Sequence, residues 1–197
     1  MNRPAIIGCT GGIGSGKTVV VKAFERLGVP GYDCDSRAKE LYDEDSVLLA
    51  QVAQIAGDDV ISDGKLDRRA LAAQIFNDSD MLASLESVVH PAVIRDFSRW
   101  LQEQSSKLVI FESAILLDKP YLRQMADFVL LVTAPEELRI ERVMARDGLS
   151  REAVERRMAN QISDEDRRQY ADYILETNDR DAIIPQLLSI IQKWQQI

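Results

Sequence analysis

The residues from Gly11 to Thr18 read G-G-I-G-S-G-K-T and satisfy the pattern G-x-x-x-x-G-K-[ST] of a phosphate-binding loop, or P-loop. Glycines let such a loop curl until several backbone N–H groups point at one anion, and the helix that follows adds its positive end. Lys17 supplies a mobile positive charge for the β- and γ-phosphates, and Thr18 offers a hydroxyl to Mg²⁺. The residues expected to contact the nucleotide are Gly12, Ile13, Gly14, Ser15, Gly16, Lys17 and Thr18.

The sequence around this loop alternates between strand-like and helix-like patterns. Ala5 to Cys9 is a short apolar run that predicts a buried strand before the loop, and apolar residues then recur at helical spacing until Gly28. Further strands are expected at Val29–Asp33, Lys107–Glu112, Phe128–Thr133 and Tyr173–Leu175. A C-terminal helix is expected to bury one face, made of Ile183, Leu187, Ile190, Ile191 and Trp194. The alternation predicts an α/β fold with a parallel five-stranded sheet flanked by helices.

Two helical segments interrupt this alternation. Residues 36–104 form a long, mostly helical insertion, and residues 135–170 form a second helical excursion that is dense in arginine. Helical insertions of this kind usually cover ligands in phosphotransfer enzymes, and the alternative for either segment is a plain scaffold. We therefore expect a nucleotide-binding core made of residues 1–35, 105–134 and 171–197, a helical acceptor-binding subdomain of residues 36–104, and an arginine-rich lid of residues 135–170.

The overall composition argues against several classes of partner. The chain has 197 residues, a formal net charge of -8 and a pI of about 4.8, so its surface as a whole does not attract nucleic acid or an anionic membrane. The first residues lack the pattern of a signal peptide, and no stretch approaches the ~20 apolar residues of a membrane helix. Cys9 and Cys34 are expected to be buried small side chains. A cytoplasmic protein is expected, monomeric or at most a weak homo-oligomer.

The P-loop alone does not separate kinases from other nucleotide-binding proteins, but the rest of the chain favours a kinase. A regulatory GTPase carries D-x-x-G and N-K-x-D, and neither motif occurs here. A kinase needs an acceptor-side carboxylate, and Asp33 and Asp35 follow the second expected strand, at the sheet edge where ligands bind. It also needs arginines in a lid, and Arg139, Arg142 and Arg146 share one face of the helix after Pro135.

The chain resembles the dephospho-CoA kinase family along nearly its whole length. The motifs that carry this resemblance are T-G-G-I-G-S-G-K-T (10–18), D-C-D-S-R-A (33–38), D-G-K-L-D-R-R-A-L (63–71), L-E-S-V-V-H-P (85–91), T-A-P-E-E-L-R-I-E-R-V-M-A-R-D (133–147) and a stretch at 161–173 ending in A-D-Y. The chain departs from the family pattern at F-E-S-A-I-L-L-D (111–118), at Asp33-Cys34-Asp35, and at E-T-N-D (176–179).

The resemblance implies a P-loop kinase fold, with residues 36–104 as the subdomain for the CoA acceptor. It implies transfer of the γ-phosphoryl group of ATP to the ribose 3′-hydroxyl of dephospho-CoA, with Mg²⁺ held by Thr18. The implied catalytic residues are Lys17, Asp33 and Arg142. Beyond the loop, ATP contacts are implied for Arg142, Arg146 and Asn178. Acceptor contacts are implied for Asp33, Asp35, Arg37, Arg69, His90 and Glu112.

Two other functions remain open from the residues. One is a P-loop kinase that acts on another nucleotide, nucleoside or metabolite. The other is a non-catalytic, nucleotide-gated binding protein, which would need neither Asp33 nor clustered lid arginines. For His90, the alternative to an acceptor contact is a structural histidine at a helix start.

Overall fold

The computed structural model describes all residues except 1–2, 76–77, 179, 181 and 196–197. The side chains of Trp194 and Gln195 also lie outside the description, and so does the expected burial of Trp194. The chain divides into two compact units. The first comprises Met1–Asp33 with Gln104–Ile197, and the second comprises Cys34–Glu103.

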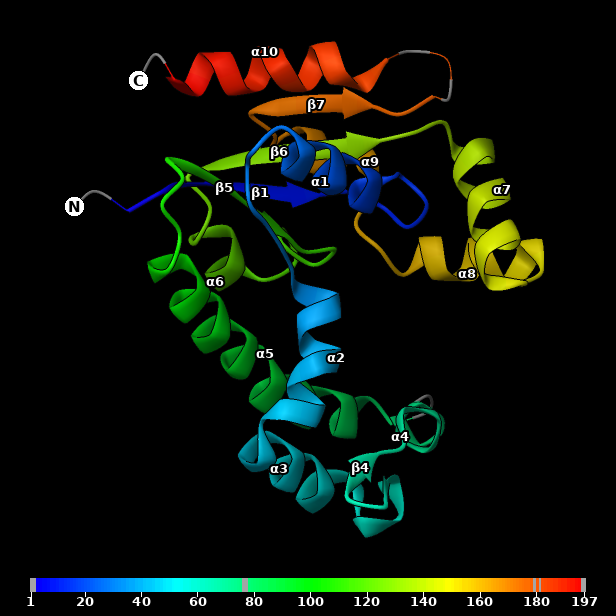
Figure 1. Ribbon diagram of the computed structural model, residues 1–197. Helices are drawn as coiled ribbons and strands as arrows, with labels where there is room; N and C mark the ends of the chain where they lie inside the picture. Colours follow the sequence, from blue (N-terminus) through cyan, green and yellow to red (C-terminus); the bar gives the residue numbers. More distant parts are fainter. Residues whose placement is uncertain (1–2, 76–77, 179, 181, 196–197) are drawn as a thin grey trace. The chain divides into compact units, whose positions relative to one another are not determined.

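The first unit contains a five-stranded sheet in which every neighbouring pair is parallel (Figure 1), as the sequence predicted. The strand order is β2-β5-β1-β6-β7. The strands are β1 (Ala5–Thr10), β2 (Gly31–Asp33), β5 (Leu108–Glu112), β6 (Phe128–Thr133) and β7 (Tyr173–Glu176). Strand β2 begins two residues later than expected. Pro30 has no N–H for a ladder bond, and the N–H of Val29 instead donates to Phe24 O at the end of the preceding helix.

Helices cover both faces of this sheet. The helices of this unit are α1 (Lys17–Arg26), α6 (Pro120–Arg123), α7 (Glu136–Asp147), α8 (Arg151–Ala159), α9 (Asp164–Arg168) and α10 (Ile183–Gln195). Of these, α7 and α8 pack against each other beyond the carboxyl ends of the strands (Figure 1). Phe24 of α1 and Leu187 of α10 pack on one face of the sheet, against strand residues that include Ile7 and Leu130. On the other face a Cβ at Gly8 would lie 2.6 Å from Leu116, so this glycine lets the segment before α6 pack directly on β1.

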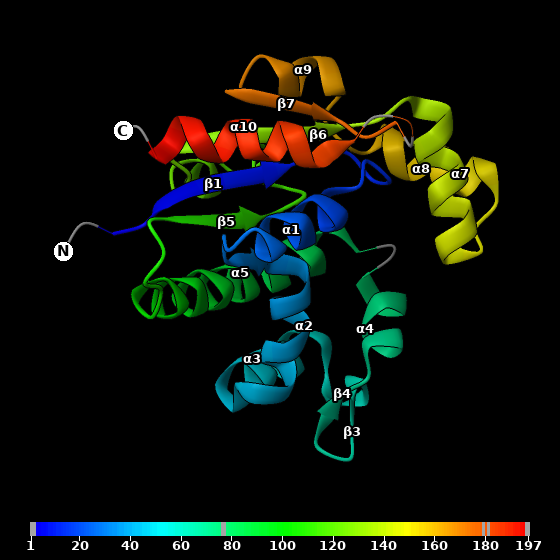
Figure 2. The same cartoon turned by 45° about the horizontal axis from the view of Figure 1, so that its top comes forward.

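The second unit is mostly helical, as predicted, and also contains a hairpin that the sequence reading missed (Figure 2). Its elements are α2 (Cys34–Glu44), α3 (Ser46–Ala56), a short 3₁₀ helix η1 (Asp58–Val60), β3 (Ile61–Ser62), β4 (Lys65–Leu66), α4 (Arg68–Ile75) and α5 (Ser79–Gln102). Asp63 and Gly64 connect β3 to β4 with φ of 51° and 74°. Asp-Gly with both φ positive is the signature of a tight two-residue turn.

His90 and Pro91 lie in the middle of α5, which runs for 24 residues. The reading of His90 as a histidine at a helix start is therefore wrong. The true start of this helix is capped by Asp78, whose side chain accepts from the N–H groups of Asp80 and Met81. Proline is tolerated here inside a long helix, where it removes one N–H donor from the hydrogen-bond ladder.

Candidate active site

The carboxyl ends of three adjacent strands bring acidic residues beside the start of the P-loop. Strand pairing places Asp33 of β2 opposite Glu112 of β5, and Glu112 opposite Cys9 of β1. The loop begins at Gly11, immediately after β1 ends at Thr10. The register therefore places two carboxylates that were predicted from sequence at the same sheet edge as the loop.

Two charged residues, Glu112 and Lys17, act on the buried thiol of Cys9. Burial raises the pKa of the Cys9 thiol, the nearby Glu112 carboxylate raises it further, and the Lys17 ammonium lowers it by a smaller amount. The thiol is fully buried and stays protonated, as the sequence reading expected for a small core side chain. The thiol therefore lies within electrostatic reach of both Lys17 and Glu112.

Helix α1 begins at the loop and, like α6 and α7, has no side-chain cap. Its cap residue Gly16 adopts a left-handed conformation with φ of 91°, no side chain caps it, and its first turn holds no acidic residue. In contrast, side chains cap α3, α5, α8 and α9; they belong to Asp45, Asp78, Ser150 and Ser163. The exposed N–H groups and positive dipole end of α1 are thus available to an anion.

Other polar groups around the loop also fit a phosphate ligand. The Lys17 ammonium folds back on the loop and donates to Gly11 O at 3.0 Å and to Gly12 O at 3.3 Å. The hydroxyls of Thr10, Ser15 and Thr133 are buried and have no hydrogen-bond partner. Buried hydroxyls are seldom left in this state, so they point to a polar ligand or water at this edge.

Arg142 of α7 joins the P-loop to the segment after β7. Its guanidinium donates to Gly14 O at 3.2 Å, to the Thr177 hydroxyl at 2.9 Å and to Thr177 O at 3.2 Å. The Thr177 hydroxyl donates in turn to Ser15 O at 2.7 Å. Asn178, the expected adenine contact, follows directly and uses its side-chain oxygen to accept from the N–H of Arg180.

Arg146, one turn further along α7, is placed differently from Arg142. Its guanidinium makes two hydrogen bonds to the neighbouring Asp147, at 2.7 and 2.9 Å, and its side chain is 64% exposed. This pairing raises the pKa of Arg146 and lowers the pKa of Asp147. Its expected role in binding ATP stays a prediction.

Three side chains that contact the loop were not assigned there from the sequence. Thr177 contacts Ser15, Arg139 donates to Ile13 O at 3.0 Å, and Gln161 accepts from the Ile13 N–H at 2.9 Å. These contacts join residues more than a hundred positions apart, so no local pattern reveals them. For Arg139 the helical spacing predicted only a face shared with Arg142 and Arg146, and not the contact with Ile13.

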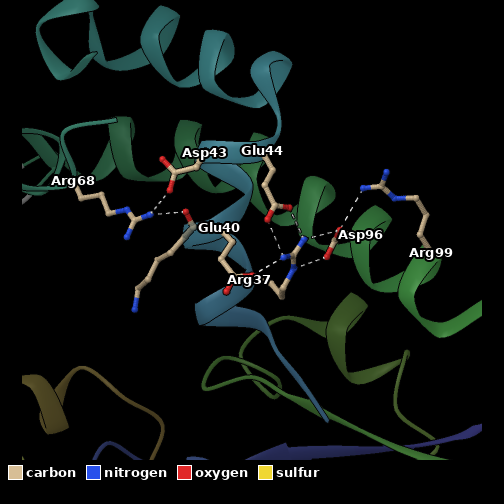
Figure 3. A network of polar contacts seen from close by, with 8 residues as sticks. Arg37, Glu40, Asp43, Glu44, Arg68, Asp96 and Arg99 are labelled. Carbon is tan, nitrogen blue, oxygen red and sulfur yellow. Dashed lines mark hydrogen bonds and ion pairs between the residues drawn. The ribbon is translucent and has the colours of Figure 1, made fainter. Parts of the chain in front are cut away.

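The acceptor candidates in the second unit occupy contrasting environments. Arg37 of α2 makes paired hydrogen bonds of 3.0 and 3.1 Å to Asp96 of α5, which is 9% exposed, and also contacts Glu40 and Glu44 (Figure 3). Asp96 is the main cause of the raised pKa of Arg37. Arg37 therefore ties α2 to α5, and its role toward the acceptor stays a prediction. Asp35 and Arg69 are exposed, and His90 is half-buried.

The comparisons with known proteins agree with this geometry. The family model described as dephospho-CoA kinase matches residues 5–182. A dephospho-CoA kinase of Porphyromonas gingivalis is 41% identical over 187 residues, which cover 94% of this chain and 92% of the relative. The chain belongs to the dephospho-CoA kinase family. Membership in this family makes it an ATP-dependent kinase.

Solved structures support the same fold. A Thermus thermophilus crystal structure superposes with a TM-score of 0.84 at 35% identity, covering 98% of both chains. A shikimate kinase from Acinetobacter baumannii gives a TM-score of 0.56 at 19% identity, covering 98% of this chain and 94% of that one. The second likeness concerns the fold alone, which is the P-loop kinase fold. Within the described part of the chain, every helix is too short or too polar to cross a lipid bilayer.

The residues of this dephospho-CoA kinase family member fit a magnesium ion that is shared with ATP. Among the described residues, no group of three His, Cys, Asp or Glu side chains could hold a metal ion. Magnesium bound together with a nucleotide needs fewer protein ligands, because phosphates and waters supply the rest. Thr18 lies in the first turn of α1, and Asp33 lies at the sheet edge where the loop begins.

A substitution at Gly14 is expected to weaken ATP binding by about tenfold or more, because the loop must move to accept it. Gly14 has φ of 78°, and a Cβ there would lie 2.5 Å from the backbone oxygen of Arg139. Gly28 gives a matched control, since its φ is 84° but nothing lies within 4 Å of its Cβ position. Both alanine variants carry a backbone strain of about 1–2 kcal/mol.

Calorimetric titration of ATP into the two variants separates crowding from strain. Only Gly14→Ala should lose affinity for ATP, whereas both variants should have a lower melting temperature than the parent protein. Equal ATP affinity in the two variants would mean that crowding by α7 at Gly14 does not affect nucleotide binding.

Proposed function

We propose that this dephospho-CoA kinase family member holds ATP on the loop from Gly11 to Thr18 and transfers its γ-phosphoryl group to the ribose 3′-hydroxyl of dephospho-CoA. The products are coenzyme A and ADP, at the last step of coenzyme A biosynthesis. The observation that carries the proposal is the strand register, which brings Asp33 and Glu112 to the edge where the P-loop begins. A donor site and an acceptor carboxylate then lie on the same sheet edge.

On the donor side, we assign the triphosphate to the loop amides and the uncapped end of α1. Lys17 would leave the carbonyl oxygens of Gly11 and Gly12 and bind the β- and γ-phosphates, because a phosphate oxygen is a stronger acceptor than a neutral carbonyl. Arg142 would stabilise the charge of the transferring group, a role in which arginine is effective. Arg146 and Asn178 would contact the rest of the nucleotide.

On the acceptor side, we assign Asp33 to the 3′-hydroxyl. A carboxylate in hydrogen-bond reach of that hydroxyl orients it and accepts its proton as the new P–O bond forms. The proton then resides on an Asp33 oxygen, while ADP leaves with the electrons of the broken P–O bond. Glu112, the register neighbour of Asp33, would help to hold the ribose.

Magnesium bound to the phosphates would neutralise part of their charge, and Thr18 would hold it through its hydroxyl, with Asp33 nearby. For the remaining acceptor contacts we propose residues of the unit Cys34–Glu103, namely Asp35, Arg37, Arg69 and His90. We propose that residues 135–170 act as the lid over ATP. The two free, buried cysteines are consistent with work in the reducing cytoplasm.

A coupled assay of ADP release tests the acceptor directly. Dephospho-CoA should stimulate ADP release, and the product should carry one additional phosphate on the ribose. A panel of nucleosides and nucleoside monophosphates serves as the comparison. Stimulation by one of these, and not by dephospho-CoA, would favour another small-molecule kinase. ATP binding without any stimulated ADP release would favour a non-catalytic binding protein.

A further inference from the structure

Side chains from outside the loop hold both main-chain polar groups of Ile13, near the tip of the P-loop. The Ile13 N–H donates to the side-chain oxygen of Gln161 at 2.9 Å, and the Ile13 carbonyl accepts from Nε of Arg139 at 3.0 Å. Gln161 follows α8, and Arg139 lies on α7. Because these bonds fix the two peptide groups of Ile13, they also constrain the direction of the amides that follow at Gly14 and Ser15.

Arg139 is itself fixed by an ion cluster whose two arginines are buried. Its Nη1 pairs with Asp164 at 2.8 Å, and the other oxygen of Asp164 accepts from Arg167 at 3.0 Å. Arg139 is 7% exposed and Arg167 is 2% exposed. Buried ion clusters of this kind add little net stability, because desolvation offsets their attraction. Stability alone therefore does not account for a cluster placed against the phosphate loop.

The glycine at position 12 makes room for this guanidinium. The φ of Gly12 is not positive, so its backbone does not itself require glycine. A Cβ at Gly12 would lie 2.1 Å from Nη2 of Arg139. The loop and Arg139 therefore fit each other sterically as well as through hydrogen bonds.

We propose that Arg139 is a positioning residue for phosphoryl transfer. Together with Gln161 it keeps the P-loop in the shape that binds the triphosphate, and Asp164 keeps Arg139 in place. The guanidinium acts through the loop backbone. This inference rests on the proposed function in one respect, which is that the loop binds ATP. Beyond that function, it assigns a role to Arg139, Gln161 and Asp164.

The main variant is Arg139→Met, which removes the donors while keeping a long side chain. Asp164 retains Arg167 as its partner in this variant, and a cavity of about 510 Å³ borders the site, so the new side chain has room. The dissociation constant for ATP and the KM for ATP should rise by about tenfold, since small misplacement of binding groups is costly. The KM for dephospho-CoA should stay close to that of the parent.

Arg139→Lys gives a graded comparison, because a lysine can replace one of the bonds to Ile13 and Asp164 but not the paired geometry. It should recover part of the lost ATP affinity. Gln161→Met removes the acceptor for the Ile13 N–H and should shift the same two ATP parameters. Arg151→Met is the matched control: Arg151 lies on α8 and pairs with Glu137 and Glu155 at the surface, so its loss should leave ATP binding unchanged.

Two outcomes would overturn the inference. One is an unchanged ATP dissociation constant in Arg139→Met. The other is an equal rise in the KM for both substrates together with a lower melting temperature, which would indicate a merely structural role. Titration with ATP alone needs no acceptor. If the parent binds ATP but fails to phosphorylate dephospho-CoA, the proposed function fails while the test of Arg139 still stands.

Discussion

Replacing Asp33 with asparagine is expected to lower kcat for phosphorylation of dephospho-CoA by roughly 10²–10⁴-fold, the usual contribution of a positioned acid or base. Asparagine keeps the shape of the side chain but cannot take the proton of the acceptor hydroxyl. Asp33 is the last residue of β2, and its register partner Glu112 ends β5, which in turn pairs with β1, the strand that leads into the P-loop. The substitution therefore alters the chemistry at the sheet edge and not the core. Affinity for ATP should change little.

Single-turnover measurements at saturating ATP would test this expectation, because they separate phosphoryl transfer from product release. Asp59→Asn is a suitable control, since Asp59 is an exposed carboxylate of η1 in the other unit. A transfer rate for Asp33→Asn within about threefold of the parent would be too small for loss of a base and would leave Asp33 with an orienting role at most.

Replacing Arg142 with methionine is expected to lower kcat by about 10³-fold or more, as for other arginines that stabilise a transferring phosphoryl group. Arg142 donates to Gly14 O within the P-loop and to the two oxygens of Thr177, whose hydroxyl itself donates to Ser15 O of the loop. The guanidinium is therefore already held at the loop that binds the phosphates. Because Gly14 O loses a donor, a smaller rise in the KM for ATP is expected as well.

Variants at two further arginines test whether the loss of kcat is specific to Arg142. Arg146→Met should lower kcat far less, because Asp147 already binds the guanidinium of Arg146 at the surface. Arg156→Met removes an exposed arginine of the same segment and should leave kcat unchanged. Similar losses in all three variants would show that the overall positive charge of the segment matters rather than the position of Arg142.

The sequence predicted the sheet well because its strands are buried on both faces. Phe128–Thr133 is a continuous apolar run, and its predicted bounds match β6. The hairpin in the second unit was missed, although Asp63-Gly64 carries a recognised turn signal. Each of its strands has only two residues, which is too short to show an alternating pattern.

The site was predictable where chemistry follows a local motif, as at Lys17 and Thr18. Asp33 and Glu112 were predicted separately, and only the strand register shows that they are neighbours. The contacts of Thr177, Arg139 and Gln161 with the loop depend on tertiary packing across most of the chain, so no spacing in the sequence indicates them. A charged residue such as Arg139 also looks like a surface residue until its burial is known.

The uncapped start of α1 has a thermodynamic consequence beyond catalysis. A helix that begins at glycine loses roughly a few tenths of a kcal/mol relative to one with a side-chain cap, and the buried hydroxyls of Thr10, Ser15 and Thr133 add unmet polar groups at the same edge. A nucleotide that satisfies these groups binds the native state and not the unfolded chain. Saturation at a hundred times the dissociation constant then raises the free energy of unfolding by about 2.7 kcal/mol. In a cell, the ATP supply would therefore help to set how long each molecule stays folded.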